Sequence, residues 1–166
     1  LSAIMKMIPE NALIGTADSL TLMQLGVFSA LKQRNSNEIV NPFLRDNEGN
    51  FLAADSESRY DLMRKVLLTD VYLIGTNAIS ADGRLVNTDG LGNRVAAMIF
   101  GPKKVIIAAG YNKIVNTLDE AVNRIKQVCA PTNALRHARE HNLEHMFNMP
   151  CVKTGVCTDC NSALAG

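Results

Sequence analysis

Apolar runs of strand length recur along this chain, and stretches with helical spacing of apolar residues separate them. Strands are expected at residues 12–15, 38–40, 71–74, 85–86 and 105–109. The last of these is apolar throughout, which is typical of a strand buried on both faces of a parallel sheet. Helices are expected at residues 20–32, 59–69, 94–100, 118–128 and 134–146.

Local signals support several of these boundaries. The polar residues before residue 20 are typical helix N-caps, and Thr117 with Glu120 has the spacing of a capping box. Asp82-Gly83 lies between two apolar runs and predicts a hairpin turn. The chain after Pro150 is expected to be irregular. The residues at the N-terminal start of the chain resemble the end of a helix, so we expect a helical segment to be missing before Leu1.

Alternating strands and helices predict an α/β fold: a Rossmann-like, mostly parallel sheet with helices on both faces. In such sheets, ligands bind beyond the carboxyl ends of the strands. Three polar loops follow expected strands, at residues 15–19, 75–78 and 110–113. We therefore expect these loops to converge on a small-molecule site. An ordinary capped helix is the alternative explanation for the first loop.

A long polar loop, about twenty residues rich in Gly, Asn and Asp, follows the strand at 71–74, and a loop this long is often functional. Its Asn and Asp residues suit a hydroxylated or anionic ligand, although they also favour turns. Nearby cations could bind a carboxylate or phosphate, or be solvated. The expected ligand-binding residues are Thr16, Asp18, Ser19, Asn77, Asn87, Asp89, Gly90, Gly92, Asn93, Arg94, Asn112 and Lys113.

The composition limits which classes of partner and which cellular location are expected. The 166 residues predict one domain over 1–166, 47% of them are hydrophobic, and mean hydropathy is +0.03. A net charge of +1 gives no reason to expect nucleic acid as a partner. No apolar run is long enough to span a membrane, and no signal peptide is evident, so a cytoplasmic location is expected.

Cysteine placement suggests a second kind of site. Cys151, Cys157 and Cys160 crowd into a Cys-rich tail at residues 150–166, and Cys129 lies upstream. Their Cys-x5-Cys-x2-Cys spacing is compatible with zinc or an iron–sulfur cluster, whereas reduced structural thiols are the alternative. His137, His141 and His145 are spaced to share one helix face and could add ligands or form a surface stripe.

No catalytic signature is evident. The chain contains neither a Gly-x-Ser-x-Gly nor a Walker motif, and no nucleophile–base pair can be identified. Gly90-Leu91-Gly92 lacks the rest of a dinucleotide fingerprint, so NAD is not supported. Whether the chain is an enzyme stays open. Catalytic candidates are Asp89, Lys113 and Asp18.

The long segment GTNAISADGRLVNTDGLGNRVAAMIFGPKKVIIAAGYNKIV, with LDEAVNRIK, APTNA and PCVKTGVCTDC after it, resembles the LUD domain family, the lactate-utilisation proteins of the LutC and YkgG type. The resemblance covers residues 59–160, and more loosely residues 15–31. It implies a NagB/RpiA/CoA-transferase-like fold and a role in oxidising lactate to pyruvate. Iron–sulfur redox proteins are the implied partners. Together with the three polar loops, the resemblance predicts a small anionic organic molecule as the ligand, and whether the chain forms a homodimer stays open.

A remoter resemblance concerns chemistry. LIGTNAISADGRLVNTDGLGNRVAAM is similar to a segment of methylthioribose-phosphate isomerases and of related initiation-factor exchange subunits. The catalytic Asp of the isomerase motif corresponds to Asn77, and a Lys of its second motif corresponds to Thr88. An amide cannot act as a general base, so the resemblance implies a retained ligand pocket without that isomerase chemistry. Residues 15–19 weakly resemble the phosphate loop of ribose-phosphate isomerases.

Three functions are therefore weighed. The first is a LUD-domain protein that binds a small organic anion and acts with redox partners in lactate oxidation. The second is an isomerase or transferase of the same fold group, acting on a phosphorylated or CoA-linked molecule. The third is a metal or iron–sulfur interaction module built on the C-terminal cysteines.

Overall fold

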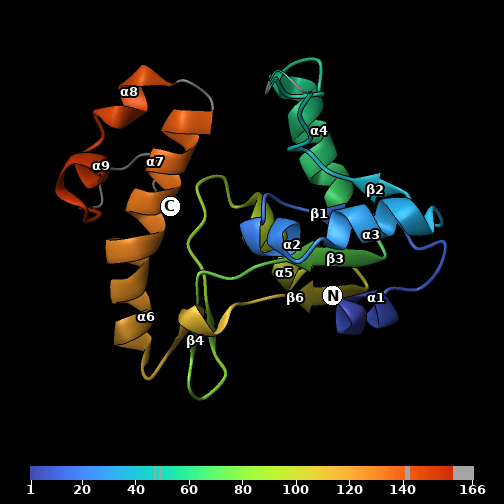
Figure 1. Cartoon of the computed structure of the whole chain (residues 1–166), viewed down its shortest axis with the longest axis horizontal. Helices are drawn as coiled ribbons and strands as arrows, with labels where there is room; N and C mark the ends of the chain where they lie inside the picture. Colours follow the sequence, from blue (N-terminus) through green and yellow to red (C-terminus); the bar gives the residue numbers. More distant parts are fainter. Residues whose placement is uncertain (47, 49, 141–142, 159–166) are drawn as a thin grey trace. The chain divides into compact units, whose positions relative to one another are not determined.

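The computed structural model describes residues 1–46, 48, 50–140 and 143–158 (Figure 1). The chain forms two compact units, and each is made of two separate stretches of sequence. Unit 1 comprises Leu1–Gly75 and Asn93–Gly110, and unit 2 comprises Thr76–Gly92 and the chain from Tyr111 onward. The expectation of one domain over 1–166 stays a prediction.

Unit 1 is built on a four-stranded parallel sheet. Its strands are β1 (Ile14–Thr16), β2 (Ile39–Val40), β3 (Val71–Ile74) and β6 (Lys104–Ile107), in the order β2-β1-β3-β6. Every neighbouring pair is parallel. The chain first moves from β1 to β2 and then crosses to the other side of β1, so the order reverses between β1 and β3. The expected mostly parallel α/β fold is confirmed.

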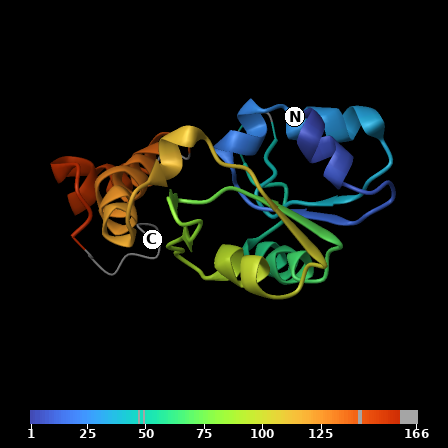
Figure 2. The same ribbon diagram turned by 90° about the horizontal axis from the view of Figure 1, so that it is seen from below.

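Helices cover both faces of this sheet (Figure 2). α1 (Ser2–Met7), α2 (Leu20–Gln24) and α3 (Val27–Arg34) cover one face; α4 (Ser56–Val66) and α5 (Asn93–Ile99) cover the other. Side chains alternate along β3 accordingly. Val71 and Leu73 pack into the first core, and Tyr72 and Ile74 pack into the second. Because every β3 side chain is buried, its sequence is continuously apolar.

The helix expected at residues 20–32 is two helices, which corrects the sequence interpretation. α2 ends before Leu25, and α3 begins after Gly26, whose φ of 72° is left-handed. Glycine reaches this region without the steric cost that a Cβ brings. The apolar spacing alone does not reveal the break, because Leu22, Val27 and Leu31 are all buried on the sheet side.

Unit 2 contains a small three-stranded sheet and four α-helices in the part that the structure describes. β4 (Ala78–Ser80) pairs antiparallel with β5 (Leu85–Val86) and parallel with β7 (Ile114–Val115). The turn at Asp82-Gly83 joins β4 to β5, so the predicted hairpin is confirmed. A short 3₁₀ helix, η1 (Tyr111–Lys113), precedes β7.

One long helical column follows β7, where two helices were expected. It consists of α6 (Leu118–Arg124), the π-helical segment η2 (Ile125–Cys129) and α7 (Ala130–Glu140) (Figure 1). Pro131 lies in the stretch left between the two expected helices. Instead, the column widens just before it. A proline has no N–H for the carbonyl four residues earlier and its ring crowds that carbonyl, and a wider turn accommodates both effects.

The C-terminal part differs from expectation in two ways. The single helix predicted for residues 134–146 is wrong, since α7 ends at Glu140 and α8 (Glu144–Phe147) starts after the non-helical Leu143. The Leu143 N–H bonds to the Ala138 carbonyl and closes the end of α7. The chain after Pro150 is not wholly irregular either: α9 (Pro150–Thr154) forms with Pro150 in its first turn, a position that needs no N–H.

The last three helices enclose their own apolar cluster. Ala134, Ala138, Met146 and Cys151 are buried together. None of the helices within the described ranges is both long enough and apolar enough to cross a membrane.

We predict that Gly101 tolerates alanine much less well than Gly26. Both have positive φ, but a Cβ at Gly101 would lie 2.3 Å from the Leu67 carbonyl oxygen, whereas a Cβ at Gly26 would meet nothing within 4 Å. Gly26→Ala should cost about 1 kcal/mol from backbone strain alone, and Gly101→Ala about 3 kcal/mol. Chemical denaturation of both variants measures the difference; equal losses would contradict this account.

Candidate functional site

The predicted ligand-binding residues divide between the two units. Unit 1 holds five of them: Thr16, Asp18, Ser19, Asn93 and Arg94. Unit 2 holds the other seven: Asn77, Asn87, Asp89, Gly90, Gly92, Asn112 and Lys113. The expected convergence of all three polar loops stays a prediction.

In unit 1, the turn after β1 lies at the sheet's switch point but uses its hydroxyl groups internally. Thr16 is 1% exposed, and its Oγ1 donates to the carbonyls of Leu73 (3.2 Å) and Ala17 (3.1 Å). Ser19 caps α2 by accepting from the Leu22 N–H at 3.4 Å. These contacts explain the turn's sequence by local structure. Asp18 is partly buried, as are Asn93 and Arg94 at the start of α5.

In unit 2, Asn77 and Asn87 fasten the two ends of the β4–β5 hairpin to each other. Asn87 Oδ1 accepts hydrogen bonds from the Asn77 N–H and the Thr76 hydroxyl, both at 3.1 Å. Asn77 Oδ1 in turn accepts from the Thr88 N–H at 3.1 Å. The two side-chain amides thus hold the ends of the hairpin together, a role that fits both turn formation and a ligand site. They also fix the backbone carbonyl of Asn77 in position.

Arg124 connects this hairpin to the 3₁₀ segment. From the last turn of α6, its Nη1 donates to the Asn77 carbonyl at 2.7 Å, and its Nε donates to the Asn112 carbonyl at 3.1 Å. Nη1 also lies 2.8 Å from Cys129 Sγ. We call Asn77, Asn87, Asn112, Arg124 and Cys129 the Arg124 cluster. It brings residues from two of the expected polar loops into one connected set.

The π-helical segment accounts for the contact between Arg124 and Cys129. In an α-helix, side chains five residues apart point roughly 140° away from each other. In η2 the Ala130 N–H bonds to the Ile125 carbonyl, five residues earlier, so residues at this spacing lie on consecutive turns of one face. Cys129 Sγ can then approach both Arg124 and the Asn77 carbonyl, which lies 3.6 Å away.

Sequence reasoning missed Arg124. It lies within an amphipathic helical pattern in which an arginine is ordinarily a surface residue. The available signal was Pro131, because a proline inside a continuous helical pattern predicts a distortion just before it, and distortions of this kind are frequent at functional sites.

The remaining predicted residues of unit 2 are less closely tied to the cluster. Asp89 and Gly90 lie in the loop after β5, and Gly92 precedes α5 with a φ of 82°. Lys113 ends η1 next to Asn112 and is partly buried. Their ligand-binding role, and the catalytic role of Asp18, Asp89 or Lys113, stays a prediction.

The cysteines occupy different surroundings where the structure describes them. Cys151 is 1% exposed in the apolar cluster of α7–α9, Cys157 packs against that cluster, and Cys129 contacts Arg124. Cys160 lies outside the described residues. Within those residues, no group of three or more His, Cys, Asp or Glu side chains could hold a metal. A zinc or iron–sulfur site that includes Cys160 stays a prediction.

The histidine stripe was predicted for one continuous helix, and that premise is wrong. His137 lies in α7 and His145 in α8, with a non-helical residue between the two helices; His141 lies outside the described residues. His137 and His145 therefore do not lie on one face of a single continuous helix.

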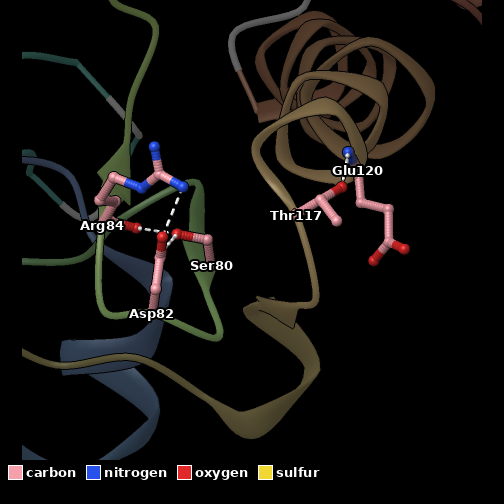
Figure 3. Close-up of polar contacts among 5 residues, drawn as sticks. All are labelled: Ser80, Asp82, Arg84, Thr117 and Glu120. Carbon is pink, nitrogen blue, oxygen red and sulfur yellow. Dashed lines mark hydrogen bonds and ion pairs between the residues drawn. The ribbon is translucent and has the colours of Figure 1, made fainter.

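The outer end of the hairpin carries its own charged cluster (Figure 3). Asp82 accepts from the Arg84 guanidinium and the Ser80 hydroxyl, and these contacts lower the pKa of Asp82 from 3.8 to about 2. Figure 3 also shows the predicted cap of α6, in which Thr117 Oγ1 accepts from the Glu120 N–H at 3.1 Å. The Glu120 carboxylate reaches back to the Asn116 N–H at 2.8 Å, one residue before the usual capping-box partner.

Comparison with known proteins places this geometry in context. A model of the LUD domain family matches residues 1–159, a range that spans both units. No curated protein matches the chain.

We predict that the hairpin's charge cluster adds stability only where Asp82 is ionised. Since folding lowers the pKa of Asp82, this contribution is complete above pH 3.8 and disappears as the pH falls toward 2. A carboxyl-carbon NMR titration should place the Asp82 midpoint near 2 and show that Arg84→Gln raises it toward 3.8. The pKa of Asp55, which the Ser58 N–H lowers, serves as the unaffected control. An Asp82 midpoint that Arg84→Gln does not move would contradict the assignment.

Proposed function

The chain belongs to the LUD domain family. From this premise we propose that it binds a small organic acid, lactate or pyruvate, while a redox partner protein exchanges electrons with the bound acid. The family is associated with lactate utilisation. The observation that carries the proposal is the Arg124 cluster. It gathers amide, carbonyl and guanidinium groups around the segment with the strongest family motifs, and none of its five residues is acidic.

The composition of the cluster favours binding over catalysis by this chain alone. Asn77 occupies the position at which the related isomerase motif has its catalytic Asp, and an amide cannot take a proton there. Oxidation of lactate to pyruvate removes two electrons and two protons. Iron–sulfur proteins accept electrons of this kind, so we assign the oxidation step to such a partner.

A ligand panel tests the proposal. We expect the melting temperature of the purified chain to rise with lactate and pyruvate, because a ligand that binds only the folded state stabilises it. Sugar phosphates, CoA and nucleotides should give no rise. A rise with those compounds alone would favour the isomerase or transferase alternative, and no rise with any of them would refute a small-molecule site.

Asn77→Asp should weaken lactate binding by roughly tenfold or more, because it adds a negative charge beside an anionic ligand. The new carboxylate can still accept the Thr88 N–H, so the hairpin clasp should persist. Asn123→Asp is the matched control, since it makes the same charge change at an exposed position of α6. Isothermal titration of both variants with lactate measures the effect. Equal affinities in the two variants would remove Asn77 from the site.

A further inference from the structure

Arg124 carries a positive charge that no acidic side chain neutralises within the described part of the chain. Its hydrogen bonds go to the Asn77 carbonyl, the Asn112 carbonyl and Cys129 Sγ, and none of these acceptors is a carboxylate. It forms no salt bridge with any described residue, although it is only partly exposed. Partial burial of an arginine without a carboxylate partner costs free energy, and a bound anion offsets that cost.

The three contacts also leave a defined part of the guanidinium unused. A guanidinium has one N–H on Nε and two on each Nη nitrogen. Nε is used by Asn112, and Nη1 is used by Asn77 and Cys129. Nη2 has no hydrogen-bond partner among the described residues, so two donors remain. Because the other donors are anchored to backbone carbonyls on two segments, the orientation of Nη2 is set before a ligand arrives.

We propose that Arg124 is the residue that binds the ligand's carboxylate, through its Nη2 group, and that Cys129 and the two carbonyls are positioning groups for it. This inference rests on the proposed function and names the recognition group within that site. None of the acceptors that Arg124 bonds to is a carboxylate, so its single positive charge is available to the ligand, and it matches a monoanionic carboxylate better than a dianionic phosphate. A planar guanidinium is also the side chain best suited to a planar carboxylate.

The π-helical segment gives the inference a structural basis. With regular α-helical geometry, Cys129 would point away from Arg124, and Nη1 would lose one of its two anchors. The irregularity before Pro131 therefore orients the guanidinium.

The test is a cycle that removes the charge from the protein and from the ligand in turn. Wild-type chain, Arg124→Gln and Arg124→Lys are titrated with lactate and with lactamide, its uncharged amide. Arg139→Gln is the matched control, because it removes an exposed arginine from α7 of the same unit. We expect Arg124→Gln to weaken lactate binding roughly 10- to 100-fold and to leave lactamide binding unchanged. Arg124→Lys should be intermediate, and Arg139→Gln should resemble wild type.

Each outcome of the cycle has a separate meaning. If wild type binds lactate but Arg124→Gln binds it equally well, or loses lactate and lactamide affinity alike, the inference fails while the proposed function stands. If wild type binds no carboxylate, both fail. Methyl phosphate binding more tightly than lactate to wild type would overturn the carboxylate assignment.

A measurement on the unaltered protein covers the case in which the Arg124 variants do not fold. The Nε–H resonance of Arg124 in a ¹⁵N spectrum should shift on addition of lactate and stay still on addition of lactamide. The Nε–H resonance of Arg139 should not respond to either. A stationary Arg124 resonance at saturating lactate would overturn the inference.

Discussion

Burial of β3 on both faces is the constraint around which unit 1 is organised. Its four residues are at most 1% exposed, they pair with β1 on one side and β6 on the other, and they alternate between two hydrophobic cores. A strand in this position must be covered by helices above and below, which accounts for α1–α3 on one face and α4–α5 on the other. It also places the order reversal of the sheet at the carboxyl end of β1 and β3, where α/β proteins bind ligands.

The sequence predicted the strands better than the helix ends, for a physical reason. Apolar runs such as residues 71–74 are typical of buried strands, and the five expected strands are confirmed to within about two residues, whereas β4 and β7 were not expected. Helical spacing, in contrast, continues across a break. Gly26 divides one expected helix and Leu143 another, although the apolar residues on both sides of each break face the same core. The stretch around Pro131 shows the opposite case: two helices were expected there, but a wider turn accommodates the proline within one helical column.

The sequence predicted only part of the candidate site, and the contacts that it missed have one structural cause. Asn77, Asn87 and Asn112 stood out because Asn is conspicuous in a long polar loop, and the structure joins their segments. Arg124 and the position of Cys129 depend on a π-helical turn, which has no apolar or polar signature of its own. Residues that act through a local irregularity of the backbone are therefore the hardest to find from a pattern, even when family membership is evident from the same sequence.

Both units are interrupted in sequence, and this affects how the chain leaves the ribosome. Residues 76–92 of unit 2 are synthesised between β3 and α5, so they emerge before unit 1 has its last strand, β6. The edge of β3 that β6 covers is exposed during that interval, and the hairpin must wait for α6 to supply Arg124. Domains usually fold from the N-terminus as they are made. Here the parallel sheet closes only after residue 107, and the guanidinium cluster forms after both the sheet and the hairpin have been synthesised.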